Sequence, residues 1–399
     1  MAVGTPFHSR TSVLCTSMNW RQWSGYFAAS SYDDFHEPEY HAIRNGAGLI
    51  DVSPLFKYQI RGRDAERLVN RLITRNAAKA QVGQVLYVPW CDRDGKVIQD
   101  GTFQRLDQTT FRATAADPTL RWFELNSEGM DVEIEDLSER VGALALQGPR
   151  SREILMELSS TDLSDLKYFW ITPTRLADVP SLVSRTGYTG DLGFEIWVSR
   201  EHAERVWDLL MEAGKGRGIT PAGMLALDLA RIEAGYPLID VDFISAEKAL
   251  IESQKSSPYE IGLGWAVNFN KPHFIGRQSL EAEKERGPAL SLVGLEVQWA
   301  ELERVFAEVE LIPQLPNVAS RSPVPVYAGE QQIGRATSSC WSKLLKKFIA
   351  LAIIKAEHGK PGTPVELEMT IEYARKRAAA KVVELPFFDP ERKRSVLRE

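Results

Sequence analysis

The stretch Arg185-Thr-Gly-Tyr-Thr-Gly-Asp-Leu-Gly-Phe-Glu-Ile-Trp197 joins a glycine-rich loop to a short alternating segment. Its three glycines recur every third residue, and glycine allows left-handed backbone angles and a close approach to a ligand. Because strand residues alternate between two faces, the segment after the loop predicts Glu195 and Trp197 on one side. The pattern indicates a carboxylate that faces a ligand, although an ordinary hairpin with Glu195 in solvent has the same spacing.

A carboxylate beside an indole suits a flat partner with paired N–H donors. A pterin ring is such a partner, because its exocyclic amine and ring N–H match the two acceptor oxygens of a carboxylate. Its faces also stack well on aromatic side chains. We therefore expect Glu195 and Trp197 to contact a bound pterin-like ring.

The composition is that of an ordinary globular protein. The chain has 399 residues, which is long for one core and predicts two or three domains. Hydrophobic residues make up 44%, charged residues 26%, and the net charge of −6 gives no case for a nucleic-acid partner or an anionic membrane. Cys15, Cys91 and Cys340 lie far apart without a CxxC motif, so neither a disulfide framework nor a zinc site is predicted.

The sequence favours a cytoplasmic protein. No apolar run approaches the ~18 residues of a membrane span. The opening residues MAVGTPFHSRTS lack the charged and apolar regions of a signal peptide.

Periodicity predicts a mixed α+β fold that ends in a β domain. Alternation at 56–60 and helical spacing at 64–73 precede two strands, 85–90 and 97–103, joined by a hairpin at Asp94-Gly95. The expected later elements are a strand at 143–146, helices at 151–158, 202–213 and 222–232, and C-terminal strands at 291–297, 324–327, 332–337, 365–369 and 379–385.

Several polar residues have both a functional and a structural interpretation. Asp100 follows three apolar or neutral residues on the returning hairpin strand, where it either orients a reacting amine or is a solvated strand end. Arg231 and Glu233 lie at the end of a predicted helix. They either belong to a buried network or form an ion pair on the surface. His36 and His41 are five residues apart with a proline between them, so we predict no metal site there.

Two further groups stay open on the sequence alone. Trp20 and Trp23, with Trp90, either wall a pocket for an apolar or cationic donor or belong to the core. The basic groups either meet an anionic ligand tail or are solvated faces. They are Lys343, Lys346 and Lys347, Arg375 to Arg377, and Arg392 to Arg394.

Taken together, these pieces resemble the glycine cleavage T-protein family, the folate-dependent aminomethyltransferases, over nearly the whole chain. The matching segments are Asp51-Val-Ser53, Leu86-Tyr87, Gly95-Lys-Val-Ile-Gln-Asp100, Leu146-Gln-Gly-Pro149, Arg185-Thr-Gly-Tyr-Thr-Gly190, Gly193-Phe-Glu195, Pro221-Ala-Gly223, Arg231-Ile-Glu-Ala-Gly-Tyr236, Gly262-Leu-Gly-Trp265, Phe274-Ile-Gly276 and Leu385-Pro-Phe387. No single segment is decisive, but their common order makes chance similarity remote.

The resemblance implies a three-domain cloverleaf around a central folate channel, with a C-terminal β-barrel or jelly-roll domain. On this basis residues 1–57 and 143–245 form a folate-binding first domain, 58–142 and 246–285 an α+β second domain, and 286–399 the barrel domain. Tetrahydrofolate is the implied acceptor.

The resemblance also assigns roles to single residues. It implies that Glu195 grips the pterin, that Tyr188, Tyr87 and Tyr236 line the folate site, and that Asp100 is the acid beside the reacting nitrogens. We expect Trp197 and Arg231 to complete the cofactor-binding set, with Asp100 as the catalytic residue.

The chain departs from the family pattern near the entrance for the one-carbon donor. It reads Asp51-Val-Ser-Pro-Leu55 where the family has Asp-Val-Ser-His-Met, and Gln99-Asp100 where the family has two adjacent acids. Leu227 replaces an arginine, and Ile239-Asp-Val-Asp242 replaces Tyr-Gly-x-Asp.

These departures favour an enzyme that moves a methyl or methylene group from a small methylated donor to N5 of tetrahydrofolate. The alternatives are an aminomethyltransferase that uses a lipoyl carrier protein as partner and a non-catalytic folate-binding protein.

Overall fold

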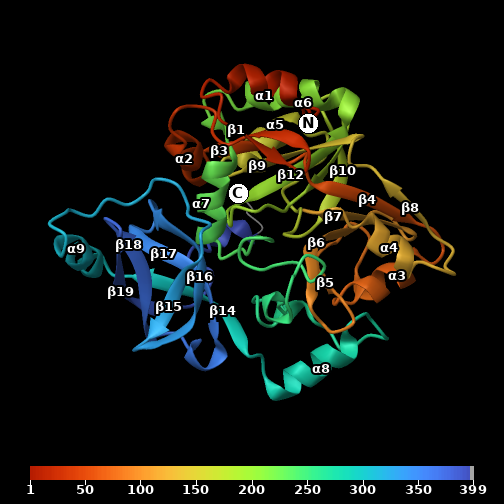
Figure 1. The fold of residues 1–399 in the computed structure, drawn as a ribbon. Coiled ribbons are helices and arrows are strands. Elements are labelled where there is room, and N and C mark those ends of the chain that lie inside the picture. Colours follow the sequence, from red (N-terminus) through yellow and green to blue (C-terminus); the bar gives the residue numbers. More distant parts are fainter. Residues whose placement is uncertain (396–399) are drawn as a thin grey trace.

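The structure is a computed structural model that describes residues 1–395 and has a mixed α+β fold (Figure 1). Two open sheets and a closed barrel are arranged around the middle of the molecule, and an N-terminal hairpin of β1 (Trp20–Trp23) and β2 (Tyr26–Ala29) lies beside the first sheet. Within the described residues no helix combines the length and apolar character that a membrane crossing requires.

The first sheet is six-stranded and is built from separate parts of the chain. Its order is β10 (Ile171–Leu176), β11 (Val179–Ser184), β12 (Gly193–Ser199), β9 (Val141–Gln147), β3 (Ala47–Asp51) and β13 (Ile219–Pro221). Only the pairing of β13 with β3 is parallel.

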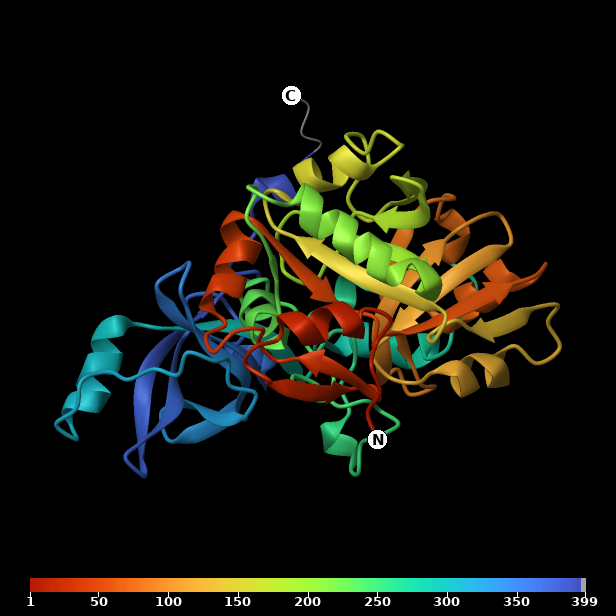
Figure 2. The same cartoon turned by 90° about the horizontal axis from the view of Figure 1, so that it is seen from above.

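One face of this sheet packs on helices and the other faces the interior of the molecule. Helices α5 (Ser151–Leu158) and α6 (Ala203–Ala213) cover Phe194, Ile196 and Val198, and α6 lies across the sheet in Figure 2. Trp197 belongs instead to the cluster that contains α7 (Met224–Glu233) and part of the barrel. The alternation predicted for β12 is therefore confirmed, and it places Glu195 on the same face as Trp197.

The second sheet is antiparallel, five-stranded and comes from one continuous segment. Its order is β5 (Val85–Cys91), β6 (Val97–Arg105), β7 (Thr110–Ala115), β4 (Phe56–Arg61) and β8 (Glu133–Asp136). One face packs its aromatic residues against α3 (Ala65–Leu72) and α4 (Leu120–Asn126). Trp90 is fully buried there against Phe103 and Phe123, so its core interpretation is confirmed.

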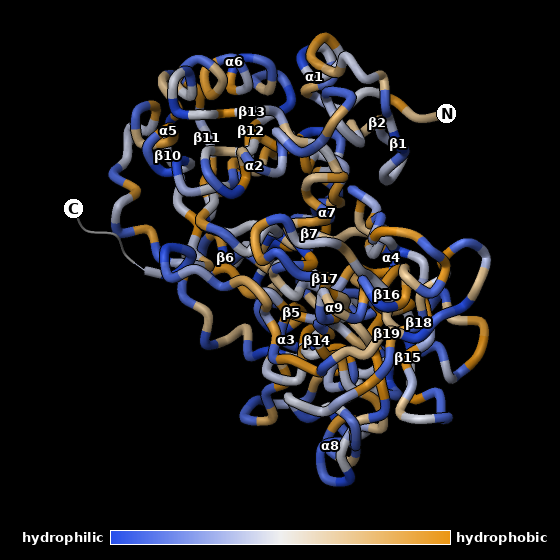
Figure 3. The backbone as a smooth tube through the Cα atoms, turned by 90° about the vertical axis from the view of Figure 1, so that its left-hand side faces the viewer, coloured by the Kyte–Doolittle hydropathy of each residue, from blue (hydrophilic) through white to orange (hydrophobic). Residues whose placement is uncertain are grey.

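The C-terminal strands close into a barrel in the order β14 (Leu290–Val297), β17 (Lys347–Lys355), β16 (Gln331–Ser342), β15 (Val324–Ala328), β18 (Pro364–Ile371) and β19 (Ala374–Val383). The predicted β domain is confirmed, although β17 was not predicted and β19 begins five residues before its expected start. Helix α9 (Trp299–Ala307) packs on β19, and the hydrophilic α8 (Arg277–Arg286) lies at the periphery (Figure 3).

Two remaining helices flank the first sheet: α1 (His8–Leu14) contacts α6, and α2 (Glu37–Asn45) contacts α7. The domain boundaries given above stay a prediction.

Candidate functional site

The polar face of the five-stranded sheet carries Asp100. Residues 100, 102 and 104 of β6 lie on one face, and Tyr87 of β5 is the register partner of Thr102, so its side chain lies on that face too. The Tyr87 hydroxyl donates to Asp100 Oδ2 at 2.6 Å. Gln99 points to the opposite face, where its amide exchanges hydrogen bonds with the backbone of Asp117. Where the family has two acids, this sheet therefore turns a single carboxylate toward the interior.

The environment of Asp100 makes it a weaker acid than an aspartate in water. Burial raises the pKa of Asp100 to about 6, and the hydrogen bond from Tyr87 partly offsets that rise. The pKa of Tyr87 lies well above its usual value because of burial and the adjacent Asp100 charge, with smaller contributions from Tyr188 and Tyr236. An acid that changes charge near pH 6 is suited to proton transfer or charge stabilisation.

Two tyrosines form an aromatic surface next to this pair. The rings of Tyr188 and Tyr236 stack with centroids 5.6 Å apart and an interplanar angle of 26°, and the Tyr188 hydroxyl donates to the carbonyl of Pro237. Trp265, which is 62% exposed, lies 6.3 Å from Tyr87, centroid to centroid. The structure therefore brings Asp100, Tyr87, Tyr188 and Tyr236 together, and their predicted roles toward a folate stay a prediction.

Glu195 lies on the opposing sheet. It accepts a hydrogen bond from the hydroxyl of Thr186. Burial raises its pKa, and both the Thr186 bond and the positive charge of Arg112 oppose that rise. Glu195 is half-buried rather than free in solvent. The hairpin interpretation with an exposed carboxylate is therefore wrong.

Trp197 is more enclosed than a ligand-stacking indole. It is 2% exposed, and its Nε1 donates to Ser184 Oγ at 3.3 Å. The guanidinium carbon of Arg112 lies 4.5 Å from the centroid of the Trp197 rings. In the structure, Trp197 supports Arg112, and its predicted contact with a cofactor stays a prediction.

The explanation given above for the glycine-rich loop is wrong for two of its three glycines. A Cβ on Gly187 or Gly193 would lie 1.9 or 2.3 Å from the side chain of Gln147, so these residues admit that buried amide. Only Gly190 has a left-handed φ, of +74°, and it packs against Ala234. The loop is shaped by close packing on its own protein.

Arg231 lies in a buried ionic network, which is one of the two alternatives. Its guanidinium donates to Asp228, Asp242 and Ser338, and to the carbonyl of Tyr236 at 3.4 Å. Arg231 is 1% exposed, and these bonds fasten α7 to β16 of the barrel. Its predicted contact with a cofactor stays a prediction, and its observed role is to hold the Tyr236 segment in place.

Glu233, two residues later, belongs to a separate buried cluster. It accepts from Tyr40, Arg44 and Ser342. Arg231 and Glu233 therefore make no pair with each other.

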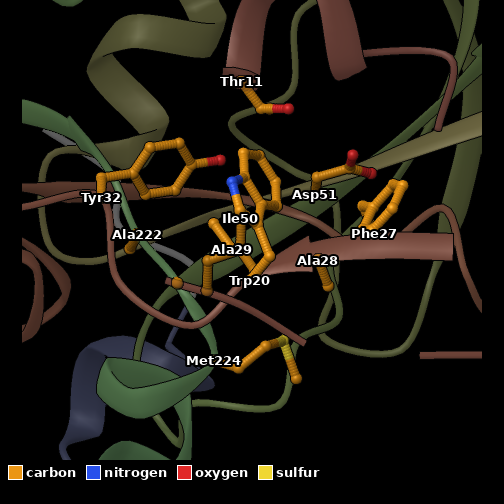
Figure 4. Close-up of a pocket in the computed structure, with 11 residues that line it drawn as sticks. Thr11, Trp20, Phe27, Ala28, Ala29, Tyr32, Ile50, Asp51, Ala222 and Met224 are labelled. Atoms are coloured by element: carbon orange, nitrogen blue, oxygen red, sulfur yellow. The ribbon is translucent and has the colours of Figure 1, made fainter. Parts of the chain in front are cut away.

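Of the tryptophans considered for a donor pocket, Trp23 packs against the cluster around α7 and its role stays a prediction, whereas Trp20 and Trp90 lie in separate clusters. Trp20 lines a cavity of about 10 Å³ with Tyr32 and Asp51 (Figure 4), which is room for about one water molecule. Trp90 lies in the core of the other sheet.

Two lysines near the site are buried, and the sequence analysis singled out only Lys393, as part of the basic group 392–394. Lys57 is fully buried, and burial lowers its pKa to about 7 while its ammonium donates to the carbonyls of Ser53 and Leu55. It holds the turn that departs from the family pattern. Lys393 is 3% exposed, with its ammonium 5.2 Å from the Tyr236 ring. A burial pattern is the only signal that could have singled out Lys57.

The basic groups near the C-terminus form ion pairs within the protein. Arg392 pairs with Asp191, and Arg394 with Asp389. Arg185 donates to the carbonyls of residues 392, 393 and 395, which holds this segment beside Tyr236. Across residues 1–395 no cluster of three or more His, Cys, Asp or Glu side chains could hold a metal ion.

Comparisons with known proteins agree along the whole chain. Residues 7–271 match the GCVT N-terminal domain, and residues 304–389 match the glycine cleavage T-protein C-terminal barrel domain. An aminomethyltransferase of Alkaliphilus oremlandii is 34% identical, covering 88% of both chains. A trimethylamine-oxide aldolase of Ruegeria pomeroyi is 35% identical over 99% of this chain but 48% of its own length.

The fold is also found in a solved structure. The glycine cleavage system aminomethyltransferase T from Bartonella henselae superposes with a TM-score of 0.82, covering 98% of this chain and 99% of the other at 22% identity.

Proposed function

This chain belongs to the glycine cleavage T-protein family, and on that premise we propose that it transfers a one-carbon unit from a small methylated donor to N5 of tetrahydrofolate. Its relatives include enzymes named aminomethyltransferase and trimethylamine-oxide aldolase. The observation that carries the proposal is the hydrogen-bonded pair of Tyr87 and Asp100 beside the stacked Tyr188 and Tyr236.

The residues present fit a reduced folate. Glu195 offers a half-buried carboxylate with one oxygen engaged by Thr186, which leaves acceptor capacity for the amine and N–H of a pterin. Tyr188 and Tyr236 offer an aromatic surface. Tetrahydrofolate, when bound, supplies N5 as the nucleophile.

Asp100 is the proposed catalytic residue. Above pH ~6 its carboxylate is charged, and it then takes a proton from the reacting amine or stabilises positive charge that develops there. Tyr87 holds this carboxylate in one orientation, and Arg231 holds the segment that carries Tyr236. Most of the rate enhancement then comes from positioning the two reactants.

The choice of a small donor rests on the segments that differ from the family pattern. Leu227 is buried in an apolar cluster, so its position offers no charge to a donor. Asp242 is bonded to Arg231, Thr337 and Ser338 and is part of the structural network.

A lipoyl-linked aminomethyl donor is the second candidate. It is favoured by the aminomethyltransferases that align over most of this chain, including one from Bacillus pumilus that is 31% identical over 96% of this chain and 97% of its own length. In that case a lipoyl carrier protein is the partner.

The three free, buried cysteines support the cytoplasmic location expected from the sequence.

The test is a binding titration followed by turnover. Calorimetry with tetrahydrofolate measures binding. Mass spectrometry then follows 5-methyltetrahydrofolate with a panel of N-, O- and S-methylated donors, and methylenetetrahydrofolate with donors that carry their own oxidising equivalent, such as N-oxides. Product from a small donor, lost in Asp100→Asn, supports the proposal. Product only with an aminomethylated lipoyl carrier supports the second candidate. Binding without either product returns the chain to a non-catalytic folate-binding role, and no binding overturns the folate assignment.

A further inference from the structure

Arg112 is a buried arginine in the wall of the candidate site. It lies on β7 opposite Gln104 of β6, and its Nε donates to Gln104 Oε1 at 2.7 Å. Its side chain is on the face of the sheet that carries Asp100, because residues 100 and 104 share a face and cross-strand partners do too. Arg112 is 3% exposed.

The guanidinium of Arg112 is positioned but not satisfied. Its Cζ lies 4.5 Å from the centroid of the Trp197 ring, and the hydrogen bond from Nε to Gln104 fixes its orientation. Within residues 1–395, neither its buried Nη2 nor Nε2 of Gln104 has a hydrogen-bond partner. An unpaired buried donor on a charged group is costly, so a side chain held this firmly with a free N–H is expected to meet an acceptor.

Glu195 lies close enough to Arg112 for the two charges to interact, and it projects from β12 on the same face as Trp197. The guanidinium of Arg112 lies on Trp197, two residues from Glu195 on the same face of β12, so the site presents a carboxylate acceptor and a guanidinium donor in the same region. Burial lowers the pKa of Arg112 to about 9, so the group remains positively charged at neutral pH.

The polar edge of a pterin has the complementary pattern. Its 2-amino group and N3–H are donors, and its 4-oxo oxygen is an acceptor next to them. A carboxylate alone satisfies the two donors and leaves the oxygen unpaired.

We propose that Arg112 is a specificity-determining residue that donates from Nη2 to the 4-oxo oxygen of the pterin while Glu195 accepts from the 2-amino group and N3–H. This inference rests on the proposed function, and it extends that function from a folate in general to a 4-oxo pterin in particular. Gln104 is then a positioning residue, because it acts through the orientation of Arg112. Trp197 has the same role from the other side.

The experiment compares two ligands that differ at one position. Tetrahydrofolate carries the 4-oxo oxygen, and 4-amino-4-deoxytetrahydrofolate carries a donor there and lacks N3–H. Calorimetry measures the Kd of both for the wild-type protein and for Arg112→Met. The loss at N3 affects both proteins equally, so the change in the Kd ratio between them reports on Arg112 alone.

We expect the wild-type protein to prefer tetrahydrofolate by at least about 100-fold and Arg112→Met to lose about 10- to 100-fold of that preference. The matched control is Arg105→Met. Arg105 is the next residue after Gln104, is 7% exposed, pairs with Glu66 and points away from Asp100. Its removal is expected to leave the ratio unchanged.

Each outcome bears on one statement. A ratio in Arg112→Met within twofold of the wild-type value overturns the role of Arg112 and leaves the proposed function standing. An equal loss in Arg105→Met also overturns it, because the effect is then damage to the sheet. Failure of the wild-type protein to bind tetrahydrofolate overturns the proposed function itself. If Arg112→Met does not fold by circular dichroism, Arg112→Lys keeps the charge without the planar fork, and the same ratio is expected to fall several-fold.

Discussion

The Tyr87 hydroxyl donates a 2.6 Å hydrogen bond to Asp100 Oδ2 across two neighbouring strands of the five-stranded sheet. The bond stabilises the charged carboxylate, whereas burial raises the pKa of Asp100 to about 6. Tyr87 on β5 therefore holds the pKa of Asp100 on β6 below the value that burial alone would give.

Replacing Tyr87 by phenylalanine removes the hydrogen bond that lowers the pKa of Asp100. The pKa then rises, and the pH at which activity reaches half of its plateau rises with it, by about 0.5 to 1 unit. The pH profile of kcat/KM measures this shift. Tyr327→Phe is the control, because Tyr327 makes a similar bond to Glu368 at 3.0 Å in the barrel and is expected to leave the profile unchanged. If the acidic limb of the kcat/KM profile is not shifted in Tyr87→Phe, the ionisation of Asp100 does not set that limb.

Asp100→Asn keeps the shape of the side chain but removes its charge. Turnover is expected to fall by about 10²- to 10⁴-fold, while the Kd for tetrahydrofolate changes by only a few-fold. The limb near pH 6 is expected to disappear, because activity that needs the charged carboxylate rises as pH passes its pKa. Single-turnover kinetics and calorimetry measure the two effects. Asp94→Asn in the exposed hairpin turn is the control, and full turnover in Asp100→Asn would exclude the catalytic role.

Glu195→Gln exchanges an acceptor-only carboxylate for an amide. The affinity for tetrahydrofolate is expected to fall about 10- to 100-fold, because a charge-assisted pair of hydrogen bonds is lost. Calorimetry gives the Kd directly, with Glu201→Gln at an exposed position nearby as the control. Equal affinity in Glu195→Gln and the wild-type protein would rule out the pterin assignment.

Arg231→Met is expected to destabilise the fold by about 3 to 5 kcal/mol, because it leaves Asp228 and Asp242 buried without their main partner. Urea unfolding measures the change. Arg10→Met removes an exposed pair with Asp208 and is expected to leave the urea midpoint nearly unchanged, because solvent screens that pair. Similar losses in the two variants would mean that the buried network contributes no more than a surface pair.

The sequence predicts the elements of this fold best where one face of a strand is buried. Alternation in residues 56–60 and 194–198 corresponds to β4 and β12, and the Asp94-Gly95 hairpin joins β5 and β6. Strand β17 was missed because both of its faces are buried: Phe348 and Ala350 belong to the barrel core, and Ile349 and Leu351 to the cluster around α7. A strand without a polar face has no period-two signal.

The site was predicted in part for a similar reason. Asp100, Tyr87, Tyr188, Tyr236 and Glu195 are visible through resemblance to a family, whereas Arg112 looks like any solvated arginine in an alternating strand. Its burial depends on Gln104 and on Trp197, which is 85 positions further along the chain, and only the tertiary structure brings these together. The close packing of Gly187 and Gly193 on Gln147 is likewise a contact between distant segments.

The two open sheets also differ in how far apart along the chain their strands lie. The five-stranded sheet is drawn from residues 56–136, whereas the six-stranded sheet pairs Ala47 with Ile219 across that whole insertion. Because closing a long loop costs more entropy and non-local pairing slows folding, the inserted sheet is expected to form first. The wall that carries Asp100 and Arg112 would then be complete before the strand that brings Glu195 has a sheet to join.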